Sequence, residues 1–153
     1  MPPPGRLVPN SVCRLLTLGS DPAVARRLTQ MGLLPGTEVT VIRTGPLGGP
    51  VELATEDGQS IALRTEQIRS LECDLIAQPL TAIAVAAGGR YRVRALLGGE
   101  GYRQKMAARG IAPDVRFVLA RMRPLTLALM PAGAEVTLGR GEAEKLLVEP
   151  LGE

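Results

Sequence analysis

The chain has 153 residues, of which 45% are hydrophobic and 22% charged, so it has enough apolar side chains for a buried core and too many for a disordered protein. It contains no histidine, the commonest general base and metal ligand, and its aromatic residues are two tyrosines and one phenylalanine. The formal net charge of +3 comes from the second half, which offers an electropositive face to an acidic partner unless those charges are merely solvated.

Residues 1–10, MPPPGRLVPN, place prolines where a secretory signal needs a helical apolar stretch, and they predict an extended leader. The longest apolar run, 80–87, is well short of the roughly 18 residues that cross a bilayer as a helix. Cys13 and Cys73 are too few for a disulfide scaffold, and we expect both to be small core residues. These features predict a cytoplasmic protein that does not span a membrane.

An amphipathic helix is predicted to begin at Asp21-Pro22, because Val24, Leu28 and Met31 recur at helical spacing. Gly32 stands where a helix ends in a left-handed residue, a conformation that glycine adopts without a steric penalty from Cβ. The helix is therefore expected to pack one face against a core and to stop there.

A turn at Pro35-Gly36 has the residue preferences of a type II turn and leads into an alternating strand over 38–43. The surrounding segments are more apolar than exposed loops require. Leu34, Pro46 and Leu47 are therefore either core residues or an exposed contact patch for a partner protein or a second copy of the chain.

Residues 51–63 form two apolar stretches around a turn that contains glycine, which is the pattern of a β-hairpin. Glu56 and Asp57 lie at its tip, where we expect solvent-exposed carboxylates rather than a catalytic site. Residues 64–73 predict a short helical turn that leads into a closing strand.

The same pattern then occurs a second time. Residues 27–43 align without a gap with residues 105–121, and Gly32 meets Gly110. After a short deletion in the second copy, assigned to the hairpin tip, the alignment continues to the closing strand. Asp114 replaces a glycine of the first copy, and because aspartate is less comfortable at positive φ we predict a type I turn there.

Each copy contains one helix and about five short strands, which indicates a mainly β protein built from two small closed barrels. We assign residues 1–75 to the first domain and residues 76–153 to the second. The second copy begins with a segment that predicts an introductory turn or short helix. The first element of the first copy is expected to be shortened or borrowed.

Arg90, Arg92 and Arg94 alternate along one predicted strand and therefore share one side of the sheet. Such a stripe suits an acidic protein surface or nucleic acid, and the scarcity of aromatic stacking platforms favours the protein surface. Residues 98–101, GGEG, precede a helix but lack the lysine and the hydroxyl residue of a nucleotide loop. The sequence predicts no catalytic residues and no cofactor.

One extended motif identifies a family. Residues 31–68 read MGLLPGTEVTVIRTGPLGGPVELATEDGQSIALRTEQI, and this order of helix end, turn, strand, Pro-Leu-Gly turn and hairpin resembles the FeoA family of ferrous iron transport accessory proteins. The second copy has the same pattern, with Asp114 for glycine, no arginine after Leu138 and a trimmed hairpin. The resemblance covers nearly all of the chain, as a tandem of two copies.

The resemblance implies an SH3-like barrel with a short α-helix for each copy. It also implies a non-enzymatic role beside FeoB, the membrane transporter with a cytoplasmic GTP-binding domain that imports ferrous iron. We expect contact with such a transporter through the patch and the arginine stripe named above, with self-association as a further option. The alternative is a nucleic-acid-binding or transcription-linked SH3-like protein.

A third hypothesis is a sensor of iron or zinc. It rests only on Cys13, Cys73 and surface carboxylates such as Glu142 and Glu144, which lie on the final turn and are expected to be solvent-exposed. These residues lack the density of a metal-binding loop, so no resident metal is predicted.

Overall fold

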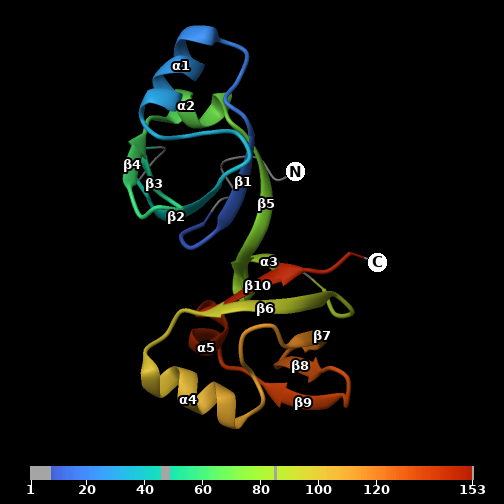
Figure 1. Ribbon diagram of the computed structural model, residues 1–153. Helices are drawn as coiled ribbons and strands as arrows, with labels where there is room; N and C mark the ends of the chain where they lie inside the picture. Colours follow the sequence, from blue (N-terminus) through green and yellow to red (C-terminus); the bar gives the residue numbers. More distant parts are fainter. Residues whose placement is uncertain (1–7, 46–48, 85, 153) are drawn as a thin grey trace. The chain divides into compact units, whose positions relative to one another are not determined.

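The computed structural model describes residues 8–45, 49–84 and 86–152. The chain divides into two compact units, 1–76 and 77–153, and each has its own buried hydrophobic core (Figure 1). No helix among the described residues is long and apolar enough to cross a membrane.

Unit 1 is a sheet with the strand order β4-β3-β2-β1-β5, to which two helices are added. Sequential strands from β1 to β4 pair antiparallel, and β5 joins the sheet beside β1. The elements of this unit are β1 (Val12–Thr17), α1 (Pro22–Gln30), β2 (Glu38–Thr44), β3 (Val51–Thr55), β4 (Ser60–Leu63), α2 (Thr65–Ser70) and the first part of β5 (Glu72–Pro79).

Unit 2 repeats this arrangement with the strand order β10-β6-β7-β8-β9. The end of β5 belongs to this unit and pairs with the outer side of β10, at Gln78 and Pro79. The remaining elements are α3 (Leu80–Ile83), β6 (Arg90–Leu96), α4 (Glu100–Ala108), β7 (Arg116–Met122), β8 (Leu125–Leu129), β9 (Ala134–Thr137), α5 (Arg140–Glu144) and β10 (Leu146–Pro150).

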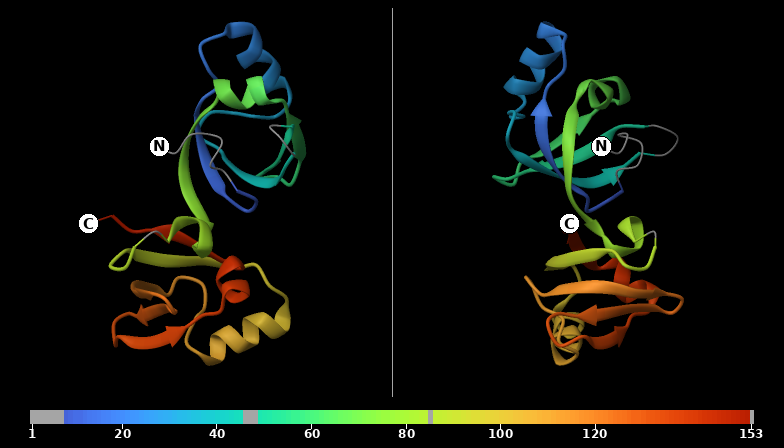
Figure 2. Two further views of the ribbon diagram at one scale, coloured as in Figure 1. Left: turned by 180° about the vertical axis from the view of Figure 1, so that it is seen from behind. Right: turned by 90° about the vertical axis from the view of Figure 1, so that its right-hand side faces the viewer.

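Each sheet curls around its own core, and in unit 1 the helices α1 and α2 lie side by side at one end of the sheet (Figure 2). The prediction of a mainly β protein is confirmed. The barrels are not closed by hydrogen bonds, because within the described residues β4 does not pair with β5 and β9 does not pair with β10.

The short helices lie where the sequence indicated them. α2 and α5 precede the last strand of each unit, at the predicted helical turns, and α3 occupies the place of the introductory turn or short helix predicted for the second copy. The first element of the first copy is expected to be shortened or borrowed. Among the described residues unit 1 has no counterpart of α3, and its first strand, Val12–Thr17, belongs to unit 1 itself.

The helix α1 begins and packs as its sequence predicts. Asp21 accepts a hydrogen bond at Oδ1 from the backbone N–H of Ala23 at 3.0 Å, which caps the helix. Leu28 is fully buried in the core of unit 1, and Val24 and Met31 pack against that core from its edge. The helical spacing therefore identified the inward face correctly.

The deletion in the second copy does not lie at the hairpin tip. Thr44 of β2 pairs with Val51 of β3 across a longer connection, whereas Met122 pairs with Leu125 across Arg123-Pro124 alone. The sequence alignment matched two similar Pro-Leu pairs and therefore assigned the deletion to the hairpin tip. Strand pairing places it between the second and third strands.

The turn after the helix has the same left-handed residue in both copies. Gly36 has a φ of 89° and Asp114 a φ of 74°. The prediction of a type I turn at Asp114 is therefore wrong. The short polar side chain of aspartate tolerates the left-handed region better than most residues do.

Replacement of Gly36 by alanine should lower the free energy of unfolding of unit 1 by about 1 kcal/mol. A Cβ at this position would meet nothing within 4 Å, so the cost is that of the left-handed backbone alone. Aspartate at position 36 should cost less, since Asp114 has this conformation naturally. Urea unfolding of the full chain, followed by NMR signals of each unit, measures both effects.

The matched control is Gly141→Ala in α5, where no positive φ is needed and the surroundings are open. This change should leave unit 2 unchanged or slightly more stable, because alanine favours a helix. Equal stability of the alanine variant at position 36 and the unmodified chain would contradict the prediction.

Candidate functional site

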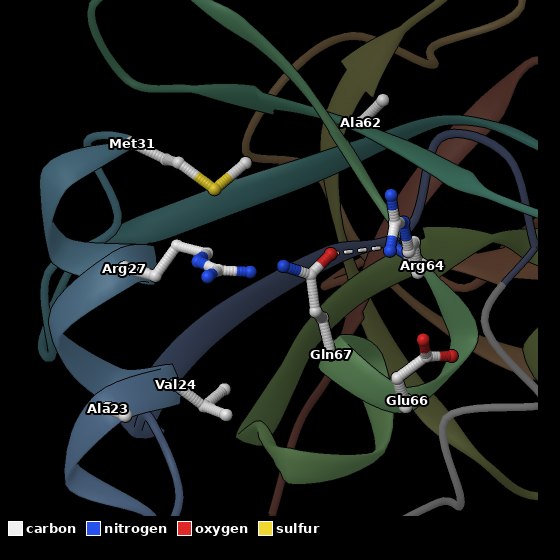
Figure 3. Close-up of a pocket in the computed structure, with 8 residues that line it drawn as sticks. All are labelled: Ala23, Val24, Arg27, Met31, Ala62, Arg64, Glu66 and Gln67. Carbon is white, nitrogen blue, oxygen red and sulfur yellow. Dashed lines mark hydrogen bonds between the residues drawn. The ribbon is translucent and has the colours of Figure 1, made fainter.

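An open groove lies in unit 1 between α1, α2 and the end of β4 (Figure 3). It has a volume of about 450 Å³. The residues that line it come from both helices, their ends and β4: Ala23, Val24, Arg27, Met31, Ala62, Arg64, Glu66 and Gln67. A groove of this volume accommodates a few side chains of a partner rather than a whole domain.

The start of α2 fixes one wall of the groove. Gln67, in the first turn of α2, accepts a hydrogen bond at Oε1 from the backbone N–H of Arg64 at 2.9 Å (Figure 3). This bond satisfies a donor that the helix itself leaves without a partner. It also holds the half-buried Gln67 side chain toward α1.

The groove combines apolar contact area with positive charge. Val24 and Met31 are half-buried and form the apolar part of the α1 wall. Arg27 is exposed, and its side chain makes no ion pair or hydrogen bond with any residue that the structure describes. Its guanidinium points across the groove toward Gln67 (Figure 3). Arg64 adds a second cation and Glu66 a carboxylate.

The same place in unit 2 is occupied by the side chains of the protein itself. Glu142, in the first turn of α5, accepts a hydrogen bond at Oε1 from the backbone N–H of Gly139 at 2.9 Å, the bond that Gln67 makes in unit 1. Its second oxygen, Oε2, pairs with Lys105 Nζ at 3.1 Å and with the Arg109 guanidinium at 2.9 Å. Both cations come from α4 and its C-terminal end.

Two further bonds tie α4 to the elements that face it. The hydroxyl of Tyr102 donates to the backbone carbonyl of Glu142 at 2.8 Å, and Arg109 donates to the backbone carbonyl of Thr137. Glu142 is thus the centre of a network that joins α4, α5 and the end of β9. We call these residues, with Lys105, the Glu142 network.

The network sets the protonation of its members. The hydrogen bond from the Gly139 backbone, together with Lys105 and Arg109, holds the pKa of Glu142 below its ordinary value of 4.5. Burial, with a smaller contribution from the Glu142 carboxylate, raises the pKa of Tyr102 to about 12. At neutral pH Glu142 is therefore ionised, and the Tyr102 hydroxyl remains a hydrogen-bond donor.

Of the predicted apolar patch, the structure places one residue. Leu34 is 49% exposed, so it is not a core residue, and it does not line the groove. Its carbonyl accepts a hydrogen bond from the Thr37 hydroxyl at 2.6 Å in the turn after α1. Pro46 and Leu47 lie outside the described residues.

The arginine stripe lies on β6 but is partly neutralised from β10. Arg92 and Arg94 pair with the two carboxylate oxygens of Glu149, the second at 2.9 Å, and Arg90 is exposed. Burial of Glu149 opposes ionisation, but the bonds from both arginines outweigh it and lower the pKa of Glu149. The stripe therefore offers an acidic partner less free charge than its sequence suggested.

The two cysteines, distant in sequence, lie close together in unit 1. Cys13 is a buried core residue as predicted, whereas Cys73 is half-buried and packs against the core. β1 and β5 are neighbours, and Cys13 and Cys73 are free thiols that line a small apolar cavity of about 20 Å³. The hydrogen bond with Cys73, followed by burial, raises the pKa of the Cys13 thiol. Among the described residues there is no group of three or more histidine, cysteine, aspartate or glutamate side chains that could hold a metal ion.

Sequence reasoning missed the groove of unit 1 and the role of Glu142 in unit 2. This carboxylate was expected to be solvent-exposed, whereas its side chain is only 21% exposed. The signal was present in the repeat: Glu142 stands in the place of Gln67, and Arg109 stands in the place of Met31. A new carboxylate and a new cation in aligned positions indicate a contact between them.

The comparison with protein families matches the chain twice. The family model described as the FeoA domain matches residues 6–74 and again residues 80–150.

Several solved structures are similar to the chain. The iron(II) transport protein A of Clostridium thermocellum is 27% identical, and the match covers 97% of this chain and 87% of that one, with a TM-score of 0.45. A crystal structure of the iron uptake regulatory protein FeoA is 26% identical over 50% of this chain and 100% of that one, with a TM-score of 0.44. A zinc complex of Stenotrophomonas maltophilia FeoA, described as a prokaryotic SH3 domain protein, is 25% identical over 44% of this chain and 84% of that one, with a TM-score of 0.39.

The Glu142 network predicts a loss of stability of unit 2 in acid. Because folding lowers the pKa of Glu142, its contribution is complete above the ordinary value of 4.5 and is lost as the pH falls through the folded pKa. Glu142→Gln keeps the size and the oxygen acceptor but removes the charge. It should lower the free energy of unfolding of unit 2 at pH 7 by about 1 kcal/mol.

In the Glu142→Gln variant, the free energy of unfolding of unit 2 should fall less steeply below pH 4.5 than it does in the unmodified chain. Urea unfolding of the full chain between neutral and acid pH, with NMR signals of unit 2, measures both effects. Glu144→Gln is the control, since Glu144 is 52% exposed and pairs only with Arg140 in the same helix. An unchanged pH dependence in the Glu142 variant would rule out a stabilising role for its charge.

Proposed function

This chain belongs to the FeoA family, associated with ferrous iron transport, and carries the family domain twice, and we propose that it is a non-enzymatic accessory that contacts a FeoB-type ferrous iron transporter. The two family matches confirm the tandem resemblance found in the sequence, and the SH3-like fold comes with them. We place the contact on the cytoplasmic face of the transporter.

The observation that carries the proposal is the open groove of unit 1 in a chain of this family. Its lining offers aliphatic side chains and an exposed Arg27, which are groups that bind a protein segment. Its described lining residues include no nucleophile with an adjacent base, which acyl or phosphoryl transfer through a covalent intermediate would need. The groove therefore favours a binding role.

The arginine stripe and Leu34 are proposed as secondary contacts. Arg90 is exposed, and Leu34 presents an apolar side chain near the end of α1. The alternative of nucleic-acid binding draws its support from the same stripe, but Glu149 already engages Arg92 and Arg94. Phosphate contacts need cations that are available to the ligand. An acidic protein surface needs available cations as well, so the pairing weakens both hypotheses, and the scarcity of aromatic stacking platforms still favours the protein surface.

The full chain should bind the cytoplasmic GTP-binding domain of a FeoB transporter from the same genome in a saturable manner. Calorimetry with and without guanine nucleotide measures the affinity and its dependence on the nucleotide state. Another GTPase from that genome serves as the control partner. Absence of binding in every nucleotide state would refute the proposed partner while leaving the fold and the family unchanged.

Nucleic acid should not be retained by this chain. Proteins that bind through phosphate contacts lose affinity steeply as salt rises, so low salt is the most permissive condition for detection. Mobility-shift measurements with duplex DNA, single-stranded DNA and RNA should show no retardation even there. Retardation that disappears as the salt concentration rises would instead support the nucleic-acid alternative.

A further inference from the structure

The two units carry the same groove position with different side chains. α1 and α4 occupy matching places in the repeat, as do α2 and α5. Four positions that face the groove differ between the copies. Val24 corresponds to the larger Tyr102, and Arg27 to another cation, Lys105. Apolar Met31 corresponds to the cation Arg109, and Gln67 to Glu142, which has a similar size and a negative charge.

In unit 2 these changes fit one another. A carboxylate enters the place between the helices, and the cations of Lys105 and Arg109 converge on its Oε2 atom at 3.1 and 2.9 Å. The larger Tyr102 reaches across to the backbone of Glu142 at 2.8 Å. Unit 2 thus supplies its own occupant for the groove position.

In unit 1 the corresponding occupant is missing. Gln67 keeps the bond to the backbone N–H of Arg64, but its amide carries no charge, and Arg27 has no acidic partner among the described residues. The side chains of Val24 and Met31 are apolar and do not reach across by hydrogen bonds. The groove consequently stays open, with a volume of about 450 Å³.

We propose that the groove of unit 1 binds an extended protein segment that carries a carboxylate beside a branched aliphatic side chain. Glu142 fills the equivalent place in unit 2 as an internal substitute for that carboxylate. The identity of the partner, the transporter, rests on the proposed function, whereas the chemistry of the groove does not.

The chemistry of the segment follows from the groove. A guanidinium binds a carboxylate with two parallel hydrogen bonds. Glu66 also lines the groove, but the Arg27 side chain forms no ion pair with it or with any other acid among the described residues. Burial of a partner's aliphatic side chain against Val24 and Met31 is favourable, because it removes apolar surface from water. The flexible thioether of Met31 adapts to the shape of that side chain. An extended segment presents the two kinds of side chain close together.

A pair of synthetic peptides tests the groove without the transporter. Acetyl-Gly-Leu-Glu-Leu-Gly-amide is titrated into the isotope-labelled full chain, and the same peptide with glutamine in place of glutamate is the control. The glutamate peptide should shift the NMR signals of Val24, Arg27 and Gln67 and should bind about 10-fold more tightly than the control. Equal binding of the two peptides, or shifts confined to unit 2, would overturn the proposal.

Two substitutions then test the groove with the GTP-binding domain of the transporter. Gln67→Glu places a carboxylate opposite Arg27, as Glu142 stands opposite Lys105, and should weaken binding about 10-fold without loss of stability of unit 1. Arg27→Ala should weaken binding to a similar degree. Lys105→Ala, at the matching position in unit 2, is the control and should stay within about twofold of the unmodified chain.

The two proposals fail in different ways. Discrimination between the peptides with no binding of the transporter domain would refute the proposed partner and support the groove. Binding of the transporter domain that neither the Gln67 nor the Arg27 substitution weakens, with no discrimination between the peptides, would refute the groove and support the partner. Retained stability of the Gln67→Glu variant excludes misfolding as the cause of lost binding.

Discussion

In each unit the helix before the last strand, α2 or α5, depends on one hydrogen bond at its start. The backbone N–H of Arg64 in unit 1, and of Gly139 in unit 2, receives no partner from the helix and is satisfied by a side chain three residues later. That acceptor has to be long enough to reach back along the first turn, which favours glutamine or glutamate. Since α2 faces α1 across the groove, the capping requirement also decides which functional group stands there.

The choice between an amide and a carboxylate changes the requirements on the opposite helix. A partly buried carboxylate is unfavourable unless cations and hydrogen-bond donors compensate it, and Glu142 has Lys105, Arg109 and the Gly139 backbone. A neutral amide such as Gln67 makes no such demand, so Met31 can remain apolar in the place of Arg109. Each unit is therefore consistent within itself. A glutamine at position 142 would leave Lys105 and Arg109 without their carboxylate, whereas a carboxylate at position 67 would stand opposite Arg27.

Local signals predicted most of the fold, and contacts between distant segments were not predicted. The Asp21 cap and the helical spacing located α1, and alternation located β2, because each depends on neighbouring residues. The pairing of Arg92 and Arg94 with Glu149 depends on β10 returning beside β6.

The meeting of the two cysteines likewise depends on β5 returning beside β1. These contacts follow from strand order, which periodicity within one segment does not contain. The groove of unit 1 and the Glu142 network of unit 2 are intermediate between these cases. The repeat reveals them only when aligned positions are compared in pairs, as with Gln67 and Glu142.

The duplication has a consequence for binding strength. A tandem protein with two open grooves gains affinity when both engage one partner, because the second contact becomes intramolecular. Since Glu142 occupies the groove position of unit 2, this chain offers one such groove rather than two. Avidity through identical grooves therefore does not explain why both units are present. Any contribution of unit 2 to recognition has to come from surfaces that unit 1 lacks. One of them carries the exposed Arg90, on the same strand as Arg92 and Arg94, which pair with Glu149.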